Sequence, residues 1–168
     1  MSRHVTLDVR GAKCSDSTAD VIDLAIKLRS AQEADDSDDC VWALLDTEHL
    51  RHNRAKAVAE KRRGEANHIR VALSDPCYEV WTLSHVEDTG KQFLNCRKVI
   101  ERIKQQWRSV SNAPFEKKSQ ADYVKLMQFR ETAAERAKRH WENRDKSRTE
   151  VYRIIEQIET IRQPETDK

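Results

Sequence analysis

Glycine is scarce in this chain. Among 168 residues there are only three, Gly11, Gly64 and Gly90, and no two of them lie close together in the sequence. A P-loop needs clustered glycines around phosphate groups, and a dinucleotide-binding turn needs the GxGxxG pattern. A collagen-like helix needs glycine at every third position. The sequence therefore excludes all three of these structures.

Long apolar runs are absent as well. No stretch approaches the roughly 18 consecutive apolar residues of a transmembrane helix. The first residues, MSRHVTLDVR, lack the apolar segment of a signal peptide. We therefore expect a cytoplasmic protein with no membrane partner. The cysteines form no CxxC pair and have no zinc-type spacing, so we interpret them as small buried hydrophobic residues, without a disulfide framework. They are Cys14, Cys40, Cys77 and Cys96.

Charge, by contrast, is abundant and unevenly distributed. The chain has 31 Lys and Arg against 29 Asp and Glu, a formal net charge of +2. The first 50 residues carry 5 basic and 11 acidic side chains, whereas residues 91–163 carry 18 basic and 10 acidic ones. This uneven distribution of charge is typical of a protein with an acidic catalytic site beside a basic surface that binds a polyanion. The alternative is that the two regions form solvated faces of opposite charge.

The first half of the chain predicts strands that alternate with helices. Short apolar or alternating runs indicate strands, and apolar residues three or four apart indicate helices. Strands are predicted at residues 5–9, 40–45 and 67–73, and helices at residues 19–31, 53–63 and 77–86. Gly64 follows the second helix in the position of a helix stop. Pro76 precedes the third helix, where its ring favours the first turn.

From residue 91 onward the sequence shows helical patterns only. Helices are predicted at residues 93–107, 121–139 and 149–161, with a break at residues 111–115 and with Thr149 as the cap of the last helix. Strands that alternate with helices imply a parallel sheet with right-handed crossovers. We therefore predict an α/β protein in which residues 1–90 form a small parallel sheet flanked by helices. Residues 91–168 would form an all-helical extension packed on it.

Acidic residues follow two of the predicted strands. Asp46 and Glu48 come directly after one strand, and Asp75 and Glu79 follow the next. Ligands of parallel sheets gather beyond the carboxyl ends of the strands, and Mg²⁺ prefers carboxylate oxygens. The alternative is that Asp46 caps the following helix and Glu48 lies in its first turn, where the helix dipole favours an acid.

Two segments that include these acids resemble the RloB-like family. Residues 41–49 (VWALLDTEH) are similar to the family's strand that ends in an Asp-x-Asp motif. Residues 72–85 (ALSDPCYEVWTLSH) are similar to its Ser-Asn-Pro-Cys-Phe-Glu-x-Trp-x-x-x-His signature, with Asp75 in place of the Asn. Residues 143–149 (NRDKSRT), before the last helix, are also similar. The resemblance extends from about residue 4 to residue 162.

The resemblance implies a Toprim-like core and a role in prokaryotic phage defence, often beside an ATPase. Toprim domains hold Mg²⁺, or Mn²⁺, on acidic residues for phosphodiester chemistry. Asp46 matches the first Asp of the motif, and Glu48 stands at the second. Glu79 and His85 match the other signature and become candidate catalytic residues. The family's opening Glu-Gly motif, which supplies a further acid, has no counterpart, so we interpret the chain as truncated at its N-terminus.

Basic clusters offer a surface for nucleic acid. They contain Lys61, Arg62, Arg63, Arg136, Lys138 and Arg139. Such residues bind phosphates without reading bases, although solvated helix faces carry the same charges. One hypothesis is a Mg²⁺-dependent nuclease of an abortive-infection system that acts on DNA or RNA. The other is a non-catalytic module that binds nucleic acid or an AAA- or ABC-type ATPase. An open sheet edge would also allow self-association into a homo-oligomer.

Overall fold

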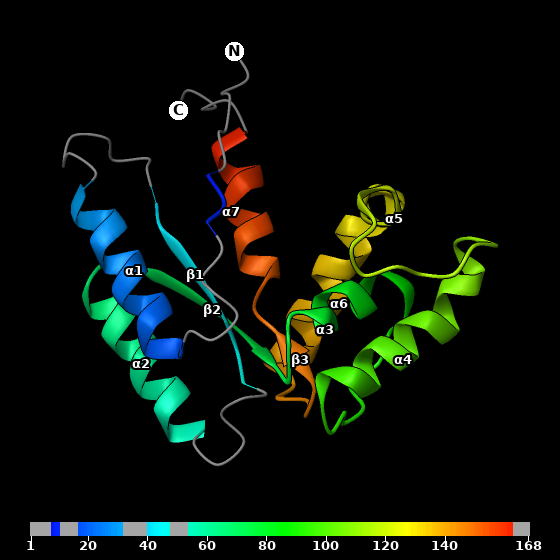
Figure 1. The fold of residues 1–168 in the computed structure, drawn as a ribbon, viewed down its shortest axis with the longest axis horizontal. Coiled ribbons are helices and arrows are strands. Elements are labelled where there is room, and N and C mark those ends of the chain that lie inside the picture. The colour runs from blue at the N-terminus through cyan, green and yellow to red at the C-terminus, as the bar shows by residue number, and fades with distance from the viewer. Residues whose placement is uncertain (1–7, 11–16, 32–39, 48–53, 163–168) are drawn as a thin grey trace.

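A computed structural model describes residues 8–10, 17–31, 40–47 and 54–162 of the chain (Figure 1). In chain order the elements are α1 (Thr18–Ala31), β1 (Trp42–Asp46), α2 (Arg54–Ala66), β2 (Arg70–Asp75), α3 (Glu79–Val86), α4 (Cys96–Gln106), the 3₁₀ turn η2 (Trp107–Ser109), α5 (Gln120–Leu126), the 3₁₀ turn η3 (Met127–Phe129), α6 (Arg130–Glu142), β3 (Arg148–Thr149) and α7 (Tyr152–Arg162). The α/β class is confirmed. The strand predicted at residues 5–9 lies largely outside the described residues.

The sheet is mixed rather than wholly parallel. β2 lies between its two partners and pairs in parallel with β1, as predicted. In this pairing Asp46 lies opposite Ser74. β3 pairs with the end of β2 in the antiparallel direction, with Ser74 opposite Thr149. The sequence predicted a wholly parallel sheet and no strand after residue 91. Both predictions were wrong, because β3 is antiparallel and belongs to the second half of the chain. Two residues are too few to show the alternation by which a strand is recognised in a sequence.

One core lies between the sheet and the two helices α1 and α2, which cover the same side of the strands (Figure 1). Its buried side chains come from α1, β1, β2 and the residue before β2: Ile22, Ala25, Ala43, Leu45, Ile69, Val71 and Leu73. In β1 the buried residues alternate with exposed or half-buried ones. The period-two pattern of a strand with one covered face is therefore present, although the sequence reads as a continuous apolar run.

Gly64 lies inside α2 and does not stop it. The helix continues to Ala66, so the predicted end at Gly64 was wrong. A Cβ atom on Gly64 would lie 2.9 Å from Val71 Cγ2 and 3.2 Å from Ile22 Cδ1. The absence of a side chain therefore lets α2 pass close to β2 and α1, which is a packing requirement that no local sequence pattern reveals.

The helices after β2 form the other half of the molecule (Figure 1). α3, α4 and α5 enclose a second core made of Cys77, Val80, Leu83, Val99, Ile103, Trp107, Phe115 and Leu126. α3, α6 and the start of α7 enclose a third, made of Trp81, Ala133, Ala137, Val151 and Tyr152. α3 is buried along almost its whole length, because it contributes to both cores.

Several predicted helix boundaries were wrong. The helix expected at residues 121–139 is two helices, α5 and α6, separated by η3. α3 begins at Glu79, two residues later than predicted, so Pro76 does not adjoin its first turn. Thr149 belongs to β3 and does not cap α7, which begins at Tyr152. No helix in the described ranges is long and apolar enough to cross a membrane.

The division into residues 1–90 and 91–168 stays a prediction. The second part nevertheless completes the sheet of the first, because β3 pairs with β2. The backbone N–H of Glu150 donates to the Leu73 carbonyl at 2.8 Å, and the hydroxyl groups of Ser74 and Thr149 are 2.7 Å apart. The helices of the second part are thereby held against the carboxyl end of β2.

Candidate functional site

Asp46 ends β1 at the carboxyl edge of the parallel pair. Because side chains alternate along a strand, Asp46 points to the same side of the sheet as Leu44, which is 44% exposed. It therefore points away from the core under α1 and α2. The backbone N–H of Tyr78, just before α3, donates to Asp46 Oδ1 at 2.8 Å. This bond ties the end of β1 to the start of α3 and holds the half-buried carboxylate in place.

The second strand-end acid, Asp75, lies on the opposite side of the sheet. It follows Leu73 by two residues, and that side chain is buried in the core beneath α1 and α2. The Thr47 hydroxyl donates to Asp75 Oδ1 at 2.9 Å, which links the ends of the two strands. Asp46 and Asp75 are thus neighbours in the sheet that face different ways. Glu48, the expected partner of Asp46 at a metal ion, lies outside the described residues.

Glu79 opens α3 and is buried, with 4% of its surface exposed. The Cys96 thiol donates to Glu79 Oε2 at 2.9 Å, and the Lys117 ammonium group forms an ion pair with Glu79 Oε1. Burial raises the pKa of the Glu79 carboxyl, but hydrogen bonds from Cys96, Lys117 and Cys77 outweigh burial and bring the pKa below its usual value. The carboxylate is therefore charged at neutral pH.

His85 lies near the end of α3 and is also buried, at 6% exposure. Its Nδ1 is 2.9 Å from the Trp81 carbonyl, one turn earlier, and the two rings meet edge to face at 4.7 Å. Burial lowers the pKa of the His85 imidazole below its usual range. The imidazole is therefore neutral at pH 7, and Nδ1–H donates to the carbonyl. Trp81 belongs to a core, as predicted.

Glu79 and His85 do not converge on one point. They are six residues apart on one helix, so at 3.6 residues per turn they point in different directions. Glu79 contacts Cys96 and Lys117, whereas Arg136 of α6 donates to the backbone carbonyl of Ser84 at 2.9 Å, beside His85. The two residues of the signature therefore occupy separate environments.

The predicted nucleic-acid-binding cations mostly have partners within the protein. Lys61 Nζ donates to both carboxylate oxygens of buried Glu150, at 2.7 and 2.6 Å. Arg63 pairs with Asp23 and Glu60, and Arg136 donates to Ser84. Lys138 pairs with Glu156 at 2.9 Å, and Arg139 with Asp88 at 2.5 Å. Arg62 is exposed on α2. These contacts leave Arg62 as the member of the set most open to an outside phosphate.

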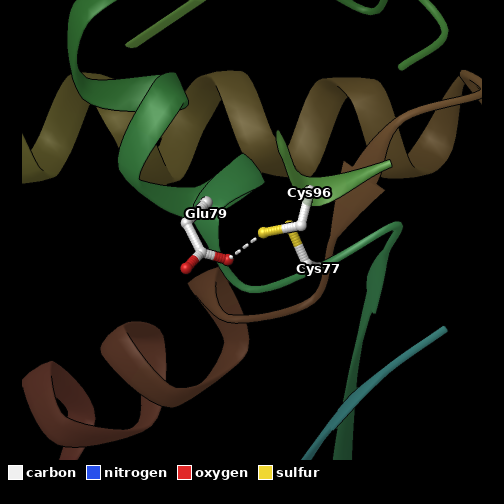
Figure 2. A group of neighbouring side chains, drawn as sticks. All are labelled: Cys77, Glu79 and Cys96. Carbon is white, nitrogen blue, oxygen red and sulfur yellow. Dashed lines mark hydrogen bonds between the residues drawn. The ribbon is translucent and has the colours of Figure 1, made fainter. Parts of the chain in front are cut away.

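A group that the sequence did not reveal gathers at the start of α3 and α4. The thiols of Cys77 and Cys96 and the Glu79 carboxylate have ligand atoms within 4.8 Å of one another (Figure 2). Cys77 is buried, Cys96 and Cys40 are half-buried, and Cys14 lies outside the described residues. The predicted burial of the cysteines is therefore confirmed for Cys77. The 18 residues between the two cysteines match no metal-binding spacing. The available signal was the closeness of Cys77 to Glu79 in the sequence.

Together, the mixed sheet, the acid at the end of β1 and the buried signature helix define an α/β protein with a candidate site at the carboxyl edge of β1. A model of the RloB-like protein family matches residues 2–158. The chain therefore belongs to the RloB-like family. Neither the curated proteins nor the solved structures contain a match to the chain.

Proposed function

We propose that this protein is a metal-dependent phosphodiesterase of the nuclease type, acting in a prokaryotic antiviral or abortive-infection system. The observation that carries the proposal is the position of Asp46. It stands at the carboxyl edge of a parallel strand pair, points away from the apolar core, and is oriented by the Tyr78 amide. Ligands of α/β sheets bind at this edge. The Toprim-like character of the core belongs to the same proposal.

In this proposal Asp46 and Glu48 bind Mg²⁺ or Mn²⁺. A carboxylate has about four acceptor positions, and the hydrogen bond from Tyr78 uses one of those on Asp46. Mg²⁺ is commonly held by one or two carboxylates together with water and substrate phosphates. When bound, such an ion activates water and offsets the charge that develops on a phosphate. Asp46 would be a well-oriented ligand because the Tyr78 amide, just before α3, holds its carboxylate in place.

The contacts of Glu79 and His85 favour roles in positioning over direct contact with substrate. Glu79 is charged and paired with Lys117, and His85 is neutral and bonded to a backbone carbonyl of its own helix. Both lie on α3, which directly follows Tyr78, the residue whose amide donates to Asp46. Catalytic roles for either residue stay predictions. A catalytic role would be supported if substitution of Glu79 or His85 changed the pH profile of cleavage and left the unfolding temperature unchanged. Loss of activity alone would not distinguish catalysis from positioning.

The function is tested by incubating the purified full chain with labelled single- and double-stranded DNA and RNA. We expect cleavage with Mg²⁺ or Mn²⁺, and none after the metal is removed with a chelator. Cleavage that returns when metal is added back supports the proposal. Cleavage that persists in excess chelator contradicts a metal-dependent mechanism and indicates a contaminating or metal-free nuclease.

A second candidate function is a non-catalytic module that binds nucleic acid or an AAA- or ABC-type ATPase. The specific observation in its favour is that Glu79 and His85, the expected catalytic residues, are buried and engaged within the protein. This alternative predicts no cleavage with either metal. It predicts instead salt-sensitive binding of nucleic acid, because contacts of basic side chains with phosphates release counterions. Turnover abolished by removal of the metal would exclude the alternative.

A further inference from the structure

The strongest unassigned feature is the group formed by Cys77, Glu79 and Cys96 (Figure 2). Cys77 lies in the loop between β2 and α3, Glu79 is the first residue of α3, and Cys96 is the first residue of α4. Figure 2 shows the two thiols side by side, with the Glu79 carboxylate facing them. Two helix N-termini therefore converge on one point, and each favours negative charge on the groups in its first turn.

The two oxygens of Glu79 have different partners. Oε2 faces the thiols and accepts from Cys96 at 2.9 Å, whereas Oε1 is paired with Lys117. Metal-binding carboxylates and imidazoles are typically held in this way by a second group that leaves one ligand atom aimed at the metal. A cation between the thiols and Oε2 would leave the Lys117 ion pair intact.

The spacing suits a tetrahedral ion bound by sulfur. Zinc bonds of about 2.0–2.3 Å place neighbouring ligand atoms about 3.5–4 Å apart. All the ligand atoms of the group lie within 4.8 Å of one another, so shifts of a fraction of an ångström are enough. Thiolates select soft or borderline cations such as Zn²⁺ over Mg²⁺. Two thiolates, one carboxylate and the Lys117 ammonium group carry a net charge of −2, which a single Zn²⁺ ion would neutralise.

We propose that Cys77, Glu79 and Cys96 bind one Zn²⁺-class ion, with a water molecule as the fourth ligand. In the metal-free protein, burial raises the pKa of the Cys96 thiol to about 12 and raises the pKa of Cys77 as well. Metal binding therefore releases protons from both thiols. The ion would tie the loop after β2 to α4 and stabilise the fold. The proposed ligands do not include Asp46, and zinc binding does not depend on phosphodiesterase activity.

The test uses the full chain with Cys14→Ser and Cys40→Ser, which removes the cysteines outside the group. Cobalt is added under reducing conditions and the absorption spectrum is recorded, followed by competition with zinc. We expect thiolate-to-cobalt charge-transfer bands in the near ultraviolet and strong tetrahedral d–d bands in the visible, saturating at one ion per chain. Zinc should abolish these bands and raise the unfolding temperature.

Two further variants in the same background decide the assignment. Cys96→Ser should eliminate the charge-transfer bands or weaken cobalt binding by at least tenfold, and Glu79→Gln should weaken binding with both thiolate bonds still visible. Far-ultraviolet circular dichroism checks that each variant is folded. Absence of thiolate bands in the parent, or equal binding by Cys96→Ser, would overturn the proposal. So would a Cys77–Cys96 disulfide that forms in preference to metal binding in the presence of reductant.

Discussion

At the scale of single residues, the contacts of the buried polar side chains indicate a structural role, because these side chains pair with one another inside the protein. Glu150 is 3% exposed and accepts from Lys61, from Arg153 at 2.9 Å and from the Leu73 amide at 3.2 Å. A buried carboxylate is tolerated only when cations and hydrogen bonds offset its loss of water. Lys61, predicted from its basic neighbours to contact nucleic acid, is thereby part of this internal network.

We therefore predict that Lys61→Ala destabilises the protein by about 3 kcal/mol, because removing one partner leaves a buried charge without its main cation. Urea denaturation at pH 7 measures the change. Arg62→Ala is the matched control on the exposed side of the same helix, and its free energy of unfolding should stay within about 0.5 kcal/mol of the wild type. Equal effects of the two substitutions would contradict the assignment.

The His85 imidazole yields a pH prediction. Its folded-state pKa is lowered by burial, whereas in the unfolded chain it is about 6.5. As the pH falls below that value, the unfolded state binds a proton that the folded state does not bind. Stability is therefore lost. We expect the wild type to lose more stability than His85→Gln between pH 7 and pH 5 in denaturant titrations. If the free energy of unfolding fell equally with pH in the two proteins, the prediction of a lowered His85 pKa in the folded state would be contradicted.

At the scale of elements, the sequence predicted what depends on local pattern and missed what depends on packing. The α1 helix and the parallel pairing of β1 with β2 followed from apolar periodicity. The two-residue strand β3 did not, because Ser74 and Thr149 pair only after the chain has folded. For the same reason the closeness of Cys96 to Glu79 could not be read from a sequence spacing. The position of Asp46 at a strand end was predictable, but the opposite orientation of Asp75 required the strand register.

The packing of α2 gives an element-scale prediction. Alanine is favoured over glycine in a helix by about 1 kcal/mol, yet a Cβ at position 64 would press on Val71 at 2.9 Å. Crowding of this kind costs about 1–3 kcal/mol. We therefore expect Gly64→Ala to lower the melting temperature despite its better helix propensity.

A double-mutant cycle tests the cause of that destabilisation. Val71→Ala removes the methyl group that the new Cβ would meet, so Gly64→Ala should cost less in the Val71→Ala background than in the wild type. Identical costs in the two backgrounds would show that crowding against Val71 is not the reason.

At the scale of the whole molecule, the uneven charge of the chain is partly neutralised by its fold. Ion pairs join acids of the first ninety residues to cations of the later ones, as Asp88 does with Arg139 and Glu79 with Lys117. Lys61 and Glu150 form the reverse combination. Acids of residues 51–90 therefore neutralise part of the basic surplus of residues 91–163, and only the cations that remain exposed are available to a polyanion. The sequence gives the number of charged residues but does not show which of them form ion pairs.

The central claim is that Asp46 binds the metal of a phosphodiesterase, and the most direct measurement is the rate of metal-dependent nucleic-acid cleavage by Asp46→Asn. Asp23→Asn, at an exposed acid of α1, serves as the matched control. We predict that Asp46→Asn lowers the rate by more than about 100-fold while circular dichroism shows a folded protein, because even changes around metal ligands cost about 10–100-fold. Asp23→Asn should cleave at the wild-type rate. Cleavage by folded Asp46→Asn at the wild-type rate would contradict the account.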